Sequence, residues 1–169
     1  RGPTLAAAQA ATLLGLLLAL AVIDARTLRL PNAVTGAGAA LAIVFAGASS
    51  ILAGEWGPLV GVVAAAAVGL GMLGVVRAAG SAAMRREAMG LGDVKLAGMI
   101  GAFLADWRLM LLTVALSALI GSVVGLALRL SPAKRVEIPY GPFLAGAAAV
   151  SLVWGHTIIQ AYVRLVLGM

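Results

Sequence analysis

The sequence predicts an all-α integral membrane protein, built as a bundle of six transmembrane helices of which the fourth is short. Hydrophobic residues make up 63% of the 169 residues, charged residues make up only 11%, and the mean hydropathy is +1.11. Soluble domains carry roughly 25% charged residues. A soluble fold of this length could not cover so much apolar surface with so few charged residues. We therefore expect the chain to lie in the lipid bilayer, which is its first expected partner.

Glycines, prolines and charged residues divide the chain into six apolar segments. A helix needs about 20 residues to cross a hydrocarbon core of about 30 Å. Four segments meet that length, namely 5–23, 33–53, 59–79 and 109–130. The last segment, 138–167, is longer, so we expect it to tilt or to begin irregularly around Pro139 and Pro142.

The fourth segment is too short to cross a bilayer. Only residues 94–105 lie between Asp93 and Asp106, which is twelve residues or about 18 Å of helix. Non-helical backbone at membrane depth is tolerated only against protein or beside a water-filled cavity. The short segment therefore predicts a wet cleft beside Asp93.

The positive charges predict the orientation of the bundle. Nine of the twelve lysines and arginines fall near the loops that join segments 1 to 2, 3 to 4 and 5 to 6. Because cytoplasmic loops are rich in Lys and Arg, we expect these loops in the cytoplasm and both termini on the outer side. This topology also accounts for the +6 net charge, so we expect no nucleic-acid partner.

Two aspartates stand at the ends of apolar segments. Asp24 closes the first segment, and Asp93 precedes the fourth in the turn Gly90-Leu91-Gly92-Asp93. An acid within or at the edge of a membrane helix is costly, which makes it a functional hypothesis by default. The predicted topology puts both acids on the cytoplasmic side, which favours a catalytic pair.

Each acid also has a structural interpretation. Asp24 could mark a helix end at the interface, where the charge reaches water. Asp93 could be the N-cap or a first-turn acid of the fourth helix, worth about 1 kcal/mol. The capping role is compatible with catalysis.

Paired carboxyls suit peptide hydrolysis without a metal or cofactor. Two close carboxyls in a low-dielectric cleft share one proton, so one can activate water while the other hydrogen-bonds the attacked carbonyl. We expect Gly90 and Gly92 to allow a tight turn and close approach of an extended substrate. Lys95 is a further candidate for substrate contact, although it could instead extend toward the membrane interface.

The remaining polar and glycine patterns predict packing. With one histidine and no cysteine, a metal site is not expected, and we expect His156 to hydrogen-bond a neighbouring helix. The small-residue pairs in 57–61 and 121–125 are typical of close helix contacts. The run 69–74 matches a dinucleotide fingerprint by letter but follows no strand, so it too predicts packing.

Three motifs resemble those of the type IV prepilin peptidases. Residues 23–32 (Ile-Asp-Ala-Arg-Thr-Leu-Arg-Leu-Pro-Asn) resemble the first aspartate motif of that family. Residues 89–98 (Met-Gly-Leu-Gly-Asp-Val-Lys-Leu-Ala-Gly) resemble its GxGD signature, and residues 138–145 (Ile-Pro-Tyr-Gly-Pro-Phe-Leu-Ala) resemble its C-terminal segment. The order of the motifs and the six segments extend the resemblance over nearly the whole chain.

This resemblance implies a membrane-embedded aspartic endopeptidase of the bacterial inner membrane. It would remove the basic leader from prepilins or pseudopilins at the cytoplasmic face, with Asp24 and Asp93 as the catalytic pair. Two departures lie outside that pair, since Ala105 stands where many members have glycine and Asn32 where an aspartate is common.

The domain expected over residues 1–169 is a single transmembrane peptidase domain. Bifunctional members of the family carry an N-terminal Cys-rich region associated with methylation, and these 169 residues contain no cysteine. We therefore expect the chain to cleave but not to methylate.

Two other classes of function stay open at this point. Paired membrane acids also bind protons or cations in small transporters, although both acids here lie toward one face and the two halves show no clear repeat. A catalytically silent assembly factor is the third possibility. Leader cleavage in the presence of a prepilin separates the peptidase from both.

Overall fold

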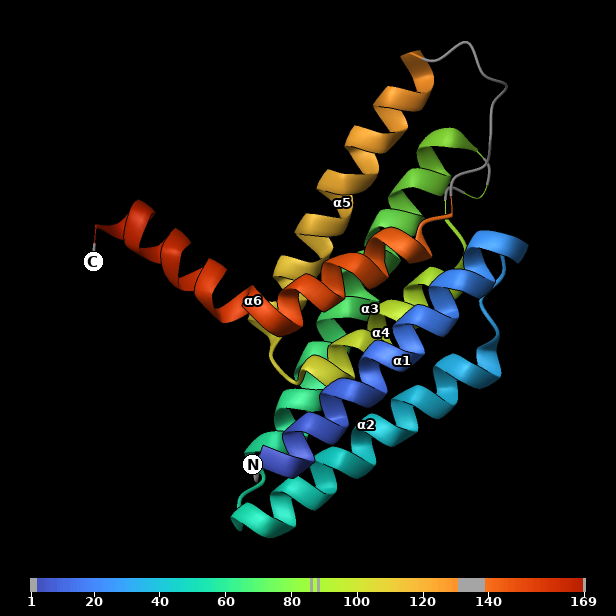
Figure 1. The fold of residues 1–169 in the computed structure, drawn as a ribbon. Helices are drawn as coiled ribbons and strands as arrows, with labels where there is room; N and C mark the ends of the chain where they lie inside the picture. The colour runs from blue at the N-terminus through green and yellow to red at the C-terminus, as the bar shows by residue number, and fades with distance from the viewer. Residues whose placement is uncertain (1–2, 86, 88, 131–138, 169) are drawn as a thin grey trace.

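A computed structural model describes residues 3–85, 87, 89–130 and 139–168, and within these ranges it contains six helices and no strand (Figure 1). The helices are α1 (Pro3–Thr27), α2 (Asn32–Ala53), α3 (Gly57–Met84), α4 (Leu91–Leu104), α5 (Trp107–Leu130) and α6 (Gly141–Leu167). All except α4 are long and apolar enough to cross a membrane. The predicted all-α architecture with a short fourth helix is confirmed.

Several helices extend beyond the boundaries expected from the charges. α1 continues past Asp24 to Thr27, α3 continues to Met84, and α4 begins at Leu91 rather than after Asp93. A charge near a helix end does not terminate the helix when the side chain finds a partner. The first helical turn, for example, has unpaired N–H groups that can donate hydrogen bonds to a carboxylate. The expected start of the last segment at Ile138 lies outside the described residues.

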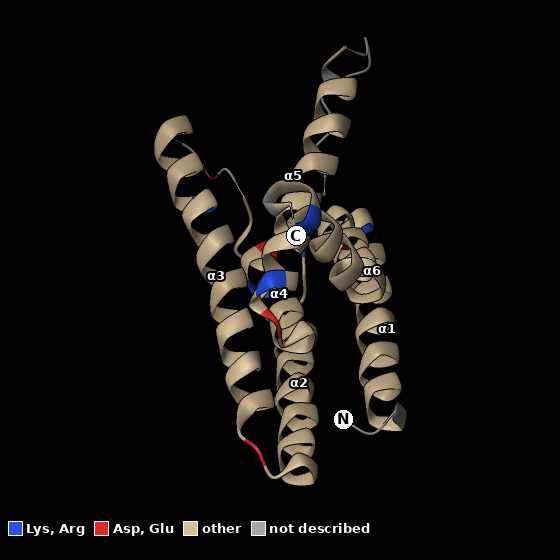
Figure 2. Ribbon diagram, turned by 90° about the vertical axis from the view of Figure 1, so that its left-hand side faces the viewer, with Lys and Arg blue, Asp and Glu red and all other residues tan. Residues whose placement is uncertain are grey.

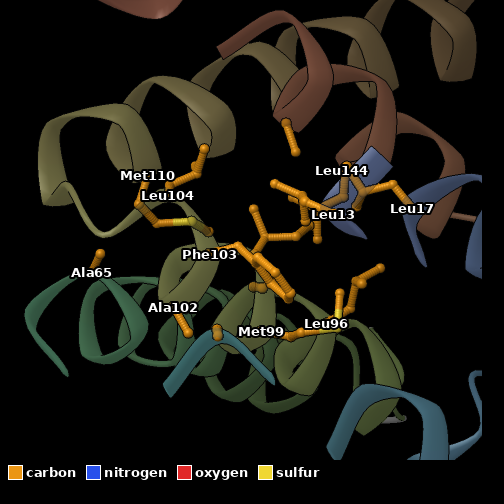
Figure 3. Close-up of a cluster of buried hydrophobic side chains, with 14 of the residues drawn as sticks. Leu13, Leu17, Ala65, Leu96, Met99, Ala102, Phe103, Leu104, Met110 and Leu144 are labelled. Atoms are coloured by element: carbon orange, nitrogen blue, oxygen red, sulfur yellow. The ribbon is translucent and has the colours of Figure 1, made fainter. Parts of the chain in front are cut away.

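α4 is the centre of the bundle. It packs against each of the other five helices, and all nine residues from Leu96 to Leu104 are buried. Figure 3 shows Leu96, Met99 and Phe103 of α4 within the cluster of buried apolar side chains. A helix buried on every side has no need of a polar face, which explains the uninterrupted apolar sequence.

Small residues allow α3 and α4 to approach closely. Gly101 of α4 lies directly against the backbone of Ala65 in α3, and Gly69 of α3 lies against the backbone of Ala97 in α4. Backbone contact of this kind replaces the hydrophobic drive that helices lack in lipid. The packing interpretation of the 69–74 run therefore holds at Gly69.

The two predicted small-residue pairs are each half right. Gly61 lies against the carbonyl of Ala105, and Gly121 lies near the rings of Tyr140 and Phe143. A side chain at Gly57 or Gly125 would meet nothing within 4 Å, so the expectation of close contacts there is wrong.

The helices carry few charged residues along their lengths (Figure 2), and many large apolar side chains are exposed on the outside of the bundle. The C-terminal half of α6 projects away from the other helices (Figure 1), and its Leu165 is 86% exposed. His156 lies on this half and is exposed, with no hydrogen bond to it among the described residues, so its expected bond to a neighbouring helix is wrong. The exposed leucines and valines fit a multi-pass protein surrounded by lipid.

Candidate active site

Asp24 lies one turn before the end of α1 and is only 5% exposed. The backbone N–H of Gly141, the first residue of α6, donates a hydrogen bond of 2.9 Å to its Oδ2. A Cβ atom at position 141 would lie 3.0 Å from the Asp24 Cγ and still closer to Oδ2. Only glycine leaves room for this contact. The interpretation of Asp24 as a solvated helix end is therefore wrong.

Asp93 is the third residue of α4, and Gly90 is the N-cap. The backbone amide of Gly90 hydrogen-bonds the Asp93 carboxylate, which is the reverse half of a capping box. The first-turn alternative is thus correct, and it places the carboxylate at the positive end of the α4 dipole.

The two glycines of the turn have no left-handed backbone that would require glycine. Gly90 has φ −65° and ψ 144°, which any residue can adopt, and among the described glycines only Gly54 and Gly168 have positive φ. A Cβ at Gly92 would lie 3.0 Å from the Cβ of Leu30. Gly92 therefore allows the segment after α1 to approach α4, and the contact of Gly90 and Gly92 with substrate remains a prediction.

The fold brings the two predicted acids together. Asp93 interacts electrostatically with Asp24, and the end of α1 and the start of α4 lie at the same end of the bundle (Figure 1). Both carboxyls are at one site although they come from motifs far apart in the sequence.

Tyr140 is a residue of this site to which the sequence analysis gave no role. It is the N-cap of α6 and interacts electrostatically with Asp93. Its Oη lies 2.7 Å from the Ser117 Oγ, and either hydroxyl can donate in this bond. The bond to Ser117 holds the Tyr140 ring beside Asp93.

Lys95 lies on the exposed side of α4 and bonds α2. Its Nζ donates a hydrogen bond of 2.9 Å to the Oδ1 of Asn32, the first residue of α2. An aspartate is common at position 32 in the family. In this chain the Asn32 side chain accepts a hydrogen bond from Lys95 at that position. A role of Lys95 in contacting substrate remains a prediction.

Arg77 holds the segment that leads into α4. Its Nε donates to the Met89 carbonyl at 3.0 Å, and its guanidinium pairs with Glu87 at 2.9 Å. Met89 directly precedes the Gly90 N-cap, so this bond helps set where α4 begins. An arginine near the end of an apolar segment, with a glutamate ten residues later, was the available sequence signal.

No group of three or more histidine, cysteine, aspartate or glutamate side chains comes together within the described part of the chain. The site thus consists of two carboxyls, a tyrosine and backbone amides.

The sequence model of the "Type IV leader peptidase family" matches residues 11–126, which include both aspartates. The chain belongs to this family. It is 42% identical over 81 residues to a protein of Pseudomonas aeruginosa named prepilin leader peptidase/N-methyltransferase, covering 47% of this chain and 28% of that protein. Proteins of the same name from Aeromonas salmonicida and Burkholderia pseudomallei are 33% identical over 153 and 156 residues, covering 89% and 91% of this chain.

The chain spans half or less of these relatives, covering 50% of the Aeromonas protein and 48% of the Burkholderia protein. No solved structure matches it. Family membership and five apolar helices of spanning length together identify a multi-pass protein of the bacterial inner membrane.

Proposed function

We propose that this chain is an aspartic endopeptidase that removes the leader peptide from prepilins or pseudopilins. The observation that carries the proposal is the meeting of Asp24 and Asp93 at one site. Family membership and the names of the relatives support the same activity. The proposed catalytic unit is the bundle itself, as a single peptidase domain.

The chemistry needs only the two carboxyls and a water. The ionised carboxyl takes a proton from the water that attacks the scissile carbonyl, and the protonated carboxyl donates a hydrogen bond to that carbonyl oxygen. The Gly141 N–H and the Gly90 amide each hold one carboxyl in place. Such positioning lowers the barrier because the reacting groups need no reorientation.

The proposed orientation puts the catalytic end in the cytoplasm and both termini outside. The Lys and Arg bias of the loops supports it. Arg77 and Lys95 lie at the same end as the two acids. Prepilin leaders are basic, and they would meet the peptidase from this side.

Co-expression with a type IV prepilin from Pseudomonas aeruginosa in a host without its own prepilin peptidase tests this function. We expect the prepilin to lose its leader, as seen by a shorter band and by mass spectrometry of the new N-terminus. An intact leader, with the chain inserted in the membrane, would contradict the proposal and favour a transporter or an assembly factor.

A further inference from the structure

Arg77 reaches from α3 to the segment that leads into the Asp93 turn. It lies about two turns before the end of α3, and its side chain is only 26% exposed. Its Nε donates a hydrogen bond of 3.0 Å to the Met89 carbonyl, and its Nη2 donates one of 2.9 Å to the Glu87 carboxylate. The planar guanidinium thus holds this segment with donors in a fixed geometry.

The Met89 carbonyl belongs to the same peptide unit as the Gly90 N–H. This unit is planar, and in the trans form its C=O and N–H point in opposite directions. The Gly90 N–H donates to the Asp93 carboxylate on one side of the unit, and Arg77 donates to the carbonyl on the other side. A rotation of this peptide away from Arg77 would therefore also turn the N–H away from Asp93.

The bond from Arg77 also makes the Gly90 N–H a better donor. Linked hydrogen bonds polarise one another in a low dielectric, and here a charged donor binds the carbonyl of the peptide whose N–H binds the acid. Glycine rotates about its backbone more freely than other residues. The orientation of the peptide before Gly90 therefore depends on contacts such as the one from Arg77.

We propose that Arg77 is a positioning residue for catalysis, which orients the peptide between Met89 and Gly90 so that its N–H holds the Asp93 carboxyl. The inference rests on the proposed peptidase function and adds a residue of α3 to it. The contact with Glu87 is secondary, because the Glu87 side chain is 81% exposed and exposed ion pairs contribute little.

Two substitutions at position 77 separate the hydrogen-bond donor from the charge. In Arg77→Gln the amide nitrogen takes the place of Nε, so a donor to the Met89 carbonyl remains while the positive charge is lost. In Arg77→Lys the charge remains, but the methylene carbon Cε takes the place of Nε.

We expect Arg77→Gln to keep kcat for prepilin cleavage within about threefold of the wild type. We expect Arg77→Lys to lower kcat by about tenfold or more with KM unchanged, because Asp93 loses its orientation and substrate binding does not change. Glu87→Gln is the control for the ion pair, and it should cleave at the wild-type rate.

The reverse order of the two variants at position 77 would overturn the inference, because the charge and not the donor would then matter. Wild-type kcat in Arg77→Lys would overturn it as well. A rise in KM at constant kcat would also contradict it, since Arg77 would then act in substrate binding.

Hydrogen exchange of the Gly90 amide tests the inference without an activity assay. In protein with isotope-labelled glycine, we expect this amide to exchange about tenfold faster in Arg77→Lys than in the wild type or Glu87→Gln. Equal exchange in all three proteins would overturn the inference. If Arg77→Lys does not insert into the membrane, Arg77→Met replaces it, because its methyl carbon also takes the place of Nε.

Failure of the wild type to cleave any prepilin would instead overturn the proposed function. The exchange rates of the Gly90 amide would still decide whether Arg77 orients this peptide.

Discussion

Asp24 and Asp93 occupy opposite ends of their helices, and this difference decides how each is held. Asp93 lies in the first turn of α4, where the helix dipole favours a carboxylate and the nearby Gly90 amide binds it. Asp24 lies one turn before the end of α1, where the dipole of its own helix opposes a negative charge. Its partner is the N-terminus of another helix, through Gly141.

The comparison teaches that one acid is placed locally and the other by the tertiary fold. Asp93 takes its position as soon as α4 forms. Asp24 reaches its position only when α6 docks against α1, because the bond to Gly141 joins residues 117 apart. Variants at the contacts of the two acids should therefore have different effects, although we propose that both acids are needed for catalysis.

Replacement of either acid by its amide should have the largest effect. Asp24→Asn and Asp93→Asn should each lower the rate of leader removal by at least about 10³-fold, because an amide keeps the shape but cannot transfer a proton. Cleavage of a prepilin by the purified variants, followed by mass spectrometry, measures the loss. Near-normal processing by either variant would remove that residue from the catalytic pair.

Gly141→Ala should damage the long-range contact. The added Cβ would overlap the Asp24 carboxylate, and loss of a charged hydrogen bond of about 1.5–3 kcal/mol corresponds to about a 10- to 100-fold fall in kcat. Gly146→Ala is the matched control on α6, since a Cβ there meets nothing within 4 Å, and it should keep the wild-type rate. Equal activity of the two variants would show that Asp24 does not depend on α6.

Cysteine accessibility should separate the two acids without an activity assay, because the chain has no cysteine of its own. With membrane-impermeant maleimides, Met84→Cys should react fast from the cytoplasmic side and Glu55→Cys only from outside. Asp93→Cys should react from the cytoplasmic side more slowly, because a thiolate must form in a confined site. Asp24→Cys should react slowest, since Asp24 is 5% exposed. Labelling of position 93 from outside would contradict the proposed topology.

Composition and segment length were enough to predict the helices, because the bilayer imposes both. The short fourth segment was predictable for the same reason. The two aspartates were predictable as functional residues because a charged side chain is costly in an apolar chain. The pattern could not show that α4 is the centre of the bundle. Its small residues Gly98 and Gly101 face α3, a contact that their spacing alone does not indicate.

The tertiary contacts of the site could not be predicted from local sequence patterns. The bond from Gly141 to Asp24, the pairing of Tyr140 with Ser117 and the bond from Lys95 to Asn32 all join different helices. Which side chains meet between two helices depends on how each helix is rotated and tilted. Packing sets this rotation and tilt, and hydropathy does not indicate it. The resemblance of residues 138–145 indicated the region that contains Gly141 and Tyr140. It did not indicate which atoms of these residues make the two contacts.

The two ends of α4 also differ, and the smallest predicted effect concerns the end far from Asp93. Ala105, where many family members have glycine, follows the helix with φ 51° and ψ 21°, and its N–H bonds the Gly101 carbonyl at 2.9 Å. The left-handed conformation costs a residue with a Cβ roughly 1–2 kcal/mol. Glycine escapes that cost but loses more entropy on folding, by about 0.4–1 kcal/mol.

Ala105→Gly should therefore raise the free energy of unfolding by about 0.5–1 kcal/mol. It should leave the cleavage rate unchanged, because the Asp93 end of α4 is untouched. Ala102→Gly is the matched control, since Ala102 is helical and buried in the same helix, and the same change should destabilise it by about 1 kcal/mol. Unfolding in mixed micelles measures both variants. If Ala105→Gly destabilised the protein as much as Ala102→Gly, the left-handed backbone at Ala105 would carry no strain. The C-terminal end of α4 would then be as stable as the end that carries Asp93.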